Sequence, residues 1–341
     1  MTAAPLPELT EIDAVIRDGE GWLDVRVVRE VTCGERRFPI HAIGLGSHDR
    51  RVPAAAFFGG FHGLERIGAE VVIAYLRSLV ARLRWDCVLQ QQLESVRLVF
   101  MPLVNPGGIW LRTRANPNGV DLMRNAPVES SARVPFMAGG QRLSAGLPWY
   151  RGAPGAAMEQ ENQAVCEVVD EELLAREFSI AIDCHSGFGV DDRIWFPYAH
   201  TLEPIANLPE VYALRGIFER AHPHHRYILE PQSSQYLAHG DLWDYLYQRA
   251  AAACGRTFLP LTLEMGSWLW VRKNPRQLLS RHGLFNPLAA HRQRRVLRRH
   301  VPFLDFIARA ACGWRGWVPR EDERAALRRQ AMALWYRGLP A

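Results

Sequence analysis

Three short apolar segments of this chain each lead to a histidine or a glutamate. The segments and the polar residues that follow them are 54–58 with His62 and Glu65, 178–183 with His185, and 259–263 with Glu264. The first segment precedes a clear helical period of apolar residues at Ile67, Val71, Val72, Tyr75, Leu76, Leu79, Val80 and Leu83. Alternating strands and helices form open α/β sheets, and the carboxyl ends of the strands meet in one crevice where ligands bind. The sequence therefore predicts an α/β fold that gathers these four polar residues.

Further elements extend this alternation. Residues 22–46 alternate apolar and polar side chains around a Cys33-Gly34-Glu35 turn, which predicts a hairpin at a sheet edge. We expect another strand at 96–104, because it runs into a turn signal rich in proline and glycine, and a helix at about 158–174.

Two segments fall outside this pattern. Residues 126–157 are rich in proline, glycine, serine and arginine and are too long for an ordinary connection, so we expect a rim or lid loop that shapes specificity. No internal repeat or clear linker divides the chain. We therefore expect one domain over 1–312 and a helical tail over 313–341 that packs on it, although an amphipathic helix for a partner or a membrane surface is the alternative reading of the tail.

Composition narrows the possible partners and surroundings. At 341 residues, with 48% hydrophobic and 23% charged residues, the chain can bury a large core. A net charge of +5 and the arginine-rich stretch 292–299 raise nucleic-acid binding as a possibility, but the stretch continues into an apolar period typical of a helix with one solvated face. We expect neither a nucleic-acid nor a membrane partner. The N-terminal residues resemble no secretory signal and the six cysteines are widely spaced, so we expect a cytoplasmic protein with reduced thiols.

The polar residues at the strand ends suit a metal. Two imidazoles and one carboxylate are the ligand set of a catalytic zinc, and a separate carboxylate can act as the proton shuttle. His62 and Glu65 are three residues apart, a spacing that is common by chance. His185 strengthens the case, because an imidazole after a buried strand is costly to desolvate without a partner. The pattern predicts metal-assisted hydrolysis.

Two further segments resemble a known family. Residues 112–125, Arg-Thr-Arg-Ala-Asn-Pro-Asn-Gly-Val-Asp-Leu-Met-Arg-Asn, are similar to the Arg-x-Asn-x-Asn-Gly-Val-Asp-Leu-Asn-Arg-Asn stretch of the M14 family of zinc carboxypeptidases. Tyr150-Arg-Gly, followed by Glu159 and Glu161, resembles that family's Tyr-x-Gly segment with its Ser-Glu-x-Glu. The resemblance extends from about residue 40 to about residue 310. It implies a single α/β domain with a mixed, mostly parallel central sheet flanked by helices, and one zinc ion per chain.

The same resemblance implies roles for individual residues. Zinc would be bound by His62, Glu65 and His185, and Glu264 would be the general base and acid. Arg114 would polarise the scissile carbonyl, with Arg112 as a rival for that role. Arg124 would bind the terminal carboxylate of the substrate, since the planar fork of an arginine matches both carboxylate oxygens.

One position departs from the family's pattern. Met123 stands where the family has a second asparagine, and a thioether cannot donate a hydrogen bond to the substrate carboxylate. Either Asn125 or an arginine compensates, or the substrate lacks an ordinary α-carboxylate, or turnover is poor.

The remaining candidates lie before the last strand. The segment Gly240-Asp-Leu-Trp-Asp-Tyr-Leu-Tyr resembles the family's segment there. The resemblance implies a mobile tyrosine that covers the bound substrate, and we expect Tyr236, four residues upstream of Gly240, to be that tyrosine. Asp241 and Leu242 would then lie near the last side chain of the substrate, where Asp241 could favour a basic residue. A second cluster of histidines at 222, 224 and 225 lacks a paired carboxylate, and we expect surface or rim residues there.

Three functions remain open at this stage. The leading hypothesis is a zinc carboxypeptidase that acts on short peptides or a modified peptide tail. The second is a zinc-dependent amidohydrolase of small N-acyl amino acids, similar to the aspartoacylase and succinylglutamate desuccinylase group. The third is a non-catalytic, zinc-stabilised binding protein, against which the carboxylate of Glu264 argues.

Overall fold

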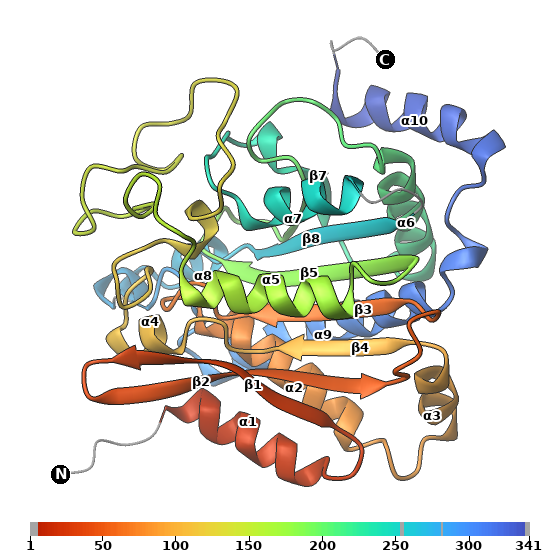
Figure 1. Cartoon of the computed structure of the whole chain (residues 1–341), viewed down its shortest axis with the longest axis horizontal. Coiled ribbons are helices and arrows are strands. Elements are labelled where there is room, and N and C mark those ends of the chain that lie inside the picture. Colours follow the sequence, from red (N-terminus) through yellow and green to blue (C-terminus); the bar gives the residue numbers. More distant parts are fainter. Residues whose placement is uncertain (1–5, 253–255, 281, 338–341) are drawn as a thin grey trace.

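The computed structural model describes residues 6–252, 256–280 and 282–337. Its centre is an eight-stranded mixed sheet in the order β1-β2-β4-β3-β5-β8-β6-β7 (Figure 1). The strands are β1 (Asp24–Cys33), β2 (Arg36–Gly46), β3 (Ala54–Gly59), β4 (Arg97–Met101), β5 (Phe178–Ser186), β6 (Arg193–Phe196), β7 (Ile228–Pro231) and β8 (Thr257–Met265). The four central strands β4, β3, β5 and β8 pair in parallel, and antiparallel pairs lie toward the edges. The predicted single α/β unit with a mixed, mostly parallel sheet is confirmed.

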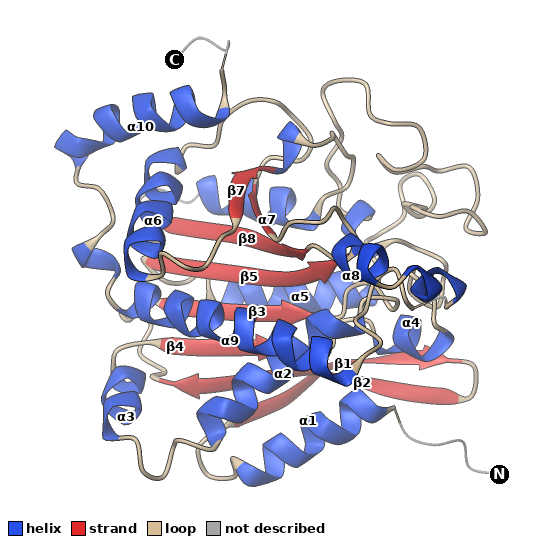
Figure 2. Ribbon diagram, turned by 180° about the vertical axis from the view of Figure 1, so that it is seen from behind, coloured by secondary structure: helices blue, strands red, loops and turns tan. Residues whose placement is uncertain are grey.

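Helices cover both faces of this sheet. Helices α5 and α7 lie on the face seen in Figure 1, and α2, α9 and α6 lie on the face seen in Figure 2. The longer helices are α1 (Pro7–Asp18), α2 (Arg66–Val80), α3 (Cys87–Glu94), α5 (Gln160–Glu172), α6 (Leu208–Ala221), α7 (Leu242–Ala251), α9 (Ala290–Cys312) and α10 (Glu321–Trp335). Two short helices, α4 (Pro106–Leu111) and α8 (Trp268–Lys273), follow strands β4 and β8.

The period of two in the strands builds two cores. Along β3, Ala55 and Phe57 join the core beneath α2 and α9, whereas Ala54, Ala56 and Phe58 join the core beneath α5 and α7. Every residue of β3 is buried, so the strand is apolar on both sides, as parallel strands covered by helices are.

The observed elements differ from the predicted ones mainly at their ends. The hairpin at 22–46 is confirmed as β1 and β2. Strand β4 ends at Met101 instead of residue 104, because Pro102 has no N–H for the ladder. Strands β5 and β8 run further than expected, so His185 and Glu264 lie on the strands and are paired in register across them.

The C-terminal segment contacts the sheet and α6. Trp314 stacks on Phe178 with ring centroids 5.1 Å apart, and the indole N–H of Trp335 donates to the carbonyl of Leu229 at 2.7 Å. Arg324 on α10 forms an ion pair with Glu210 on α6. The domain boundary at residue 312 stays a prediction. None of the helices in the described part of the chain is long and apolar enough to span a membrane.

Candidate active site

A buried cluster of three metal-ligating side chains lies at the carboxyl ends of the central strands. Ligand atoms of His62, Glu65 and His185 all lie within 4.8 Å of one another. His62 and Glu65 come from the turn between β3 and α2, and His185 comes from the end of the neighbouring strand β5. The Nδ1 atoms of His62 and His185 lie 2.9 Å and 3.0 Å from the two carboxylate oxygens of Glu65. The structure thus brings together the three residues for which the sequence predicted a metal site.

The opposite nitrogen of each imidazole is held by a buried aspartate. Asp121 Oδ1 lies 3.1 Å from His62 Nε2, and Asp183 Oδ2 lies 2.6 Å from His185 Nε2. A carboxylate at Nε2 fixes the proton there and leaves the Nδ1 lone pair free for a metal, which is the usual outer arrangement of zinc-binding histidines. The donor set, its burial and its orientation therefore fit zinc.

These two aspartates were not among the predicted site residues, although the sequence contains a signal for each. Asp121 lies within the stretch 112–125. Asp183 lies two residues before His185, and residues i and i+2 of a strand point to the same face. The indole N–H of Trp243 donates to Asp183 Oδ2 at 2.8 Å, which holds this carboxylate against the histidine.

Charge balance explains why carboxylates can be ionised in this buried place. Burial opposes ionisation of Glu65, but the charges and hydrogen bonds of His62 and His185 lower its pKa. Burial likewise opposes ionisation of Asp121, and the Arg114 guanidinium holds the pKa of Asp121 well below its usual range. The cluster is thus a network of paired charges with little exposure to solvent.

Arg114 faces this cluster and Arg112 does not. Arg114 Nη1 donates to Glu65 Oε1 at 3.2 Å, and its Nε donates to Asp121 Oδ2 at 2.8 Å. Its side chain keeps 24% of its accessible surface, so part of the guanidinium remains open. Arg112 is an exposed residue with φ 57° at the end of α4 and has no contact with the cluster among the described residues. The geometry therefore favours Arg114 over Arg112 for the role of polarising the scissile carbonyl.

Glu264 is the fourth carboxylate at this end of the sheet. It is paired in register with His185, and its Oε1 accepts a hydrogen bond from the Phe188 N–H at 3.0 Å. Burial and the nearby charge of Glu65 raise the pKa of Glu264 to about 8. A carboxyl group with a raised pKa can exchange a proton near neutral pH, which is what proton transfer requires.

Arg124 is a buried residue held by polar groups, one of which is the hydroxyl of Tyr236. Its guanidinium donates to the carbonyls of Ala138 and Met123 at 3.2 Å and 2.8 Å, and to the Tyr236 hydroxyl at 3.3 Å. Ala138 belongs to the long loop 126–157, which has no helix or strand and whose Arg151 donates to the carbonyl of Arg124 at 3.2 Å. The loop therefore helps to hold Arg124 in place.

The residues next to Arg124 in the sequence are engaged elsewhere. Met123 is 5% exposed and its side chain belongs to the apolar core beneath α5 and α7. Asn125 donates to the carbonyl of Arg151 at 3.0 Å and accepts from the Glu159 N–H at 2.7 Å. The amide of Asn125 thus stabilises the loop. Because both ends of this amide are engaged, the geometry does not favour Asn125 as a substitute for the asparagine that Met123 replaces.

Asp241 and Leu242 have structural surroundings. The Asp241 carboxylate caps α7 by accepting from the Asp244 N–H at 3.0 Å, and the residue is 2% exposed. Leu242 is fully buried in the apolar core. These positions do not favour the expected role in contacting a substrate side chain, because the Asp241 carboxylate is engaged at the start of the helix and Leu242 has no exposed surface.

The capping role of Asp241 gives a test by pH. Burial and the neighbouring charge of Asp244 raise the pKa of Asp241 to about 7. A raised folded pKa means that stability is lost as pH rises from about 4 to 7, because the folded state binds the extra proton. Asp241→Asn keeps a good cap and cannot ionise, so we expect the melting temperature at pH 8 to rise by about 2–4 °C, with a smaller difference at pH 5.

Thermal unfolding at both pH values, together with peptidase assays, would check this expectation. Asp244→Asn is the matched control and should destabilise the protein, because the Asp244 carboxylate accepts from the N–H groups of Ala199 and His200. A loss of activity confined to substrates with a basic last residue in Asp241→Asn would instead support the role in contacting the substrate side chain.

The histidine cluster at 222, 224 and 225 lies apart from the metal cluster. His222 and His225 are half-buried, and His224 is exposed. Among the residues that the structure describes, only His62, Glu65 and His185 form a group able to hold a metal ion.

Comparison with known proteins identifies the family. The family model of zinc carboxypeptidases matches residues 28–267, which is most of the chain. The chain therefore belongs to the M14 family of zinc carboxypeptidases.

Individual curated relatives match either a short part of this chain or most of it at low identity. Carboxypeptidase SOL1 of Arabidopsis thaliana is 32% identical over 93 residues, which cover 26% of this chain and 19% of that protein. Carboxypeptidase D of Drosophila melanogaster is 23% identical over 292 residues, which cover 80% of this chain and 19% of that protein. The matched region thus spans about a fifth of the length of these curated relatives.

Solved structures share the fold at low identity. A crystal structure of thrombin activatable fibrinolysis inhibitor superposes with a TM-score of 0.65 at 18% identity, and the match covers 88% of this chain and 72% of that one. Carboxypeptidase A from Helicoverpa armigera superposes with a TM-score of 0.62 at 16% identity, covering 89% of this chain and 71% of that one.

Proposed function

We propose that this chain is a zinc-dependent carboxypeptidase that hydrolyses the C-terminal peptide bond of a substrate with a free carboxylate. The observation that carries this proposal is the metal-ligating cluster at the carboxyl ends of the central strands, with Glu264 in register with His185, Arg114 bonded to Glu65, and Arg124 bonded to Tyr236. Membership in the zinc carboxypeptidase family supports the same class of reaction.

Different residues would bind the metal ion and the substrate. His62, Glu65 and His185 would hold the zinc ion. When bound, zinc supplies Lewis-acid chemistry, which polarises oxygen atoms and makes water more acidic. Arg124 uses three of its five N–H donors in hydrogen bonds to described residues, and it would bind the terminal carboxylate and so orient the last peptide bond.

Two groups would then act during bond cleavage. Glu264 has one oxygen held by the Phe188 N–H, and its other oxygen can take a proton from water and pass it to the leaving nitrogen. Arg114, fixed by Glu65 and Asp121, can donate to the oxygen that becomes negative in the tetrahedral intermediate. Tyr236, with its hydroxyl beside Arg124, can cover the bound carboxylate and exclude water.

Metal content and substrate hydrolysis in one preparation test this function. We expect one zinc ion per chain, hydrolysis of blocked dipeptides with a free carboxylate, loss of hydrolysis on chelation and recovery on zinc addition. His185→Ala should lose most of the zinc, since it removes one of three ligands. The matched control His224→Ala changes an exposed histidine outside the cluster and should keep the metal.

Other outcomes would point to the alternative functions. Hydrolysis of N-acyl amino acids without hydrolysis of dipeptides would indicate a small-molecule amidohydrolase. Full zinc occupancy without hydrolysis of dipeptides or of N-acyl amino acids would indicate a non-catalytic binding protein. Full zinc occupancy in His185→Ala would show that His185 is not a metal ligand.

A further inference from the structure

A cavity of about 940 Å³ lies away from the metal cluster. It is bounded by strands β6 and β8 and by helices α6, α8 and α9, on the side of the sheet that faces the viewer in Figure 2. None of the three metal-ligating residues lines it, nor do Arg114, Arg124 or Glu264. The peptidase chemistry therefore does not account for this cavity.

The lining of the cavity combines apolar side chains with the polar groups of Asp192, Tyr227 and His300. The apolar part includes buried side chains from two strands and two helices, namely Ile194, Leu214, Phe218, Leu261, Phe303 and Ile307. The volume falls within the range of sites that enclose a small organic ligand, about 300–1,000 Å³. An apolar group that enters would leave water for a surface of carbon atoms, which is favourable in proportion to the area removed from water.

The rim of the cavity is basic. Arg226, Lys273 and Arg295 line it and are exposed, and none of their side chains has a hydrogen bond or ion pair within the described ranges. Two other rim arginines are neutralised, since Arg215 pairs with Glu219 at 2.9 Å and Arg299 pairs with Asp192 at 2.5 Å. Asp191 also lines the cavity, is exposed and has no ion pair among the described residues, so the three unpaired positive charges face one unpaired negative charge and the balance is positive.

Two motifs of the sequence that the peptidase site leaves unused meet at this cavity. The arginine-rich stretch 292–299 contributes Arg292, Arg295 and Arg299, and the histidine cluster contributes His222 and His225. Helix α9 turns the apolar side of the same segment inward, so its arginines stand at the border between the apolar part of the lining and water.

We propose that this cavity binds an anionic amphiphile, a molecule with one apolar chain and a carboxylate or phosphate head. The chain would lie against the apolar lining, and the head would be held by Arg226, Lys273 and Arg295. An extended polyanion would leave the apolar part of the lining uncovered, and a neutral apolar molecule would make no use of the three unpaired cations.

Calorimetric titration of the intact protein with submicellar single-chain ligands tests the proposal. Affinity should rise about three- to fourfold for each added methylene from hexanoate to dodecanoate, as burial of a CH₂ group predicts. Dodecyl phosphate should bind as dodecanoate does. Dodecyltrimethylammonium, with the same chain and the opposite charge, and inorganic phosphate alone should both bind at least about tenfold more weakly. Equal binding of the cationic amphiphile, or of phosphate without a chain, would overturn the proposal.

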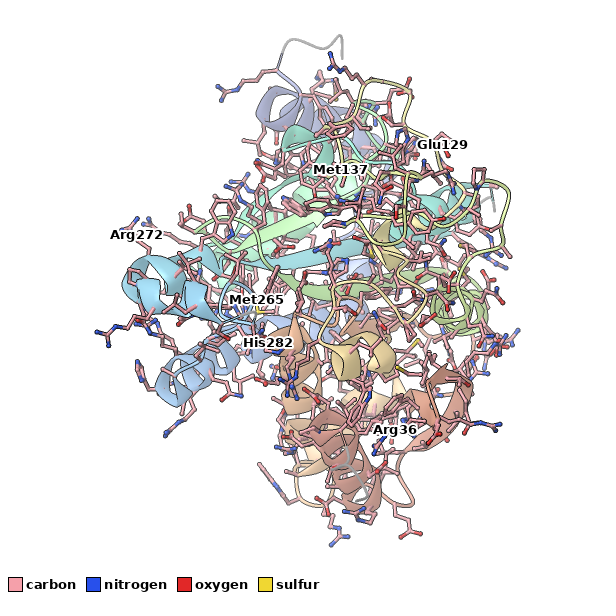
Figure 3. All side chains as sticks on the ribbon, turned by 90° about the vertical axis from the view of Figure 1, so that its left-hand side faces the viewer. Arg36, Glu129, Met137, Met265, Arg272 and His282 are labelled. Atoms are coloured by element: carbon pink, nitrogen blue, oxygen red, sulfur yellow. The ribbon has the colours of Figure 1, made fainter. Side chains whose placement is uncertain are left out.

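Charge-reversal variants locate the ligand. The double variant Lys273→Glu, Arg295→Glu should weaken dodecanoate binding by about tenfold or more, since it replaces two attractive charges with repulsive ones. The matched control is Arg272→Glu, Arg298→Glu, which makes the same change of net charge on the same two helices at exposed positions outside the cavity. Arg272 lies at the outer edge of the molecule (Figure 3). Equal weakening in both double variants would show a general charge effect and contradict the proposed site.

Discussion

Replacing Glu264 by glutamine is expected to lower kcat by about 10² to 10⁴, the usual contribution of a general acid and base. The carboxamide has the same shape, so it can still accept from the Phe188 N–H, but it cannot take a proton from water. Zinc content and the melting temperature should stay close to those of the wild type, because Glu264 is outside the set of metal ligands. Steady-state kinetics with metal analysis on the same sample would measure all three quantities.

The pH profile adds a second readout for this prediction. A general base works only when it is ionised, so activity should fall as pH falls through the pKa of Glu264. Burial raises that pKa to about 8 in the absence of a metal ion, and a bound divalent cation favours the carboxylate, so the acidic limb should lie below pH 8. Glu264→Gln should lose this limb.

Glu70→Gln is the matched control. Burial also raises the pKa of Glu70, which lies on α2 and accepts from Gln293 at 2.6 Å. The same chemical change at this position should leave kcat within about twofold, because Glu70 is bonded to Gln293 and not to a residue of the metal cluster. A fully active Glu264→Gln would mean that another group activates the water.

The metal cluster could be predicted from the sequence because its position follows from strand order alone. His62 and Glu65 lie in the turn after the buried strand β3 and His185 lies near the end of β5, and parallel strands of this kind end at one edge of the sheet. No side-chain packing has to be known for that inference. The resemblance of residues 112–125 to the family then added the loop that supplies Arg114 and Arg124.

Other parts of the site depend on packing that the sequence pattern does not reveal. Tyr236 is 112 positions from Arg124 and accepts a hydrogen bond from it, and Ala138 in loop 126–157 accepts from the same guanidinium at the end of η1 (Leu122–Arg124). No local pattern predicts these contacts. The expected roles of Asp241 and Leu242 rest on the resemblance of the segment after Gly240 to the family. In the structure, Asp241 caps the start of α7 and Leu242 packs in the apolar core.

Replacing Arg124 by alanine is expected to lower kcat/KM by about 10² to 10⁴ on peptides with a free terminal carboxylate. A hydrogen bond to a charged group contributes about 1.5–3 kcal/mol, and a fork that makes two of them is worth twice that. The effect on the amidated versions of the same peptides should be small, because an amide offers no charge for the fork to bind. Paired kinetics on acid and amide substrates would measure the difference.

The comparison with lysine separates charge from shape at this position. Arg124→Lys keeps the positive charge but loses the planar fork and the donors that reach the Ala138 and Met123 carbonyls. It should therefore recover only part of the activity on free acids. Equal losses on acids and amides in Arg124→Ala would mean that the guanidinium acts by holding Tyr236 and the loop 126–157 together, since these are the groups it contacts in the structure. In that case the substrate carboxylate must be bound elsewhere. The replacement of the family's asparagine by the buried Met123 would then fit a chain in which this region does not bind a carboxylate.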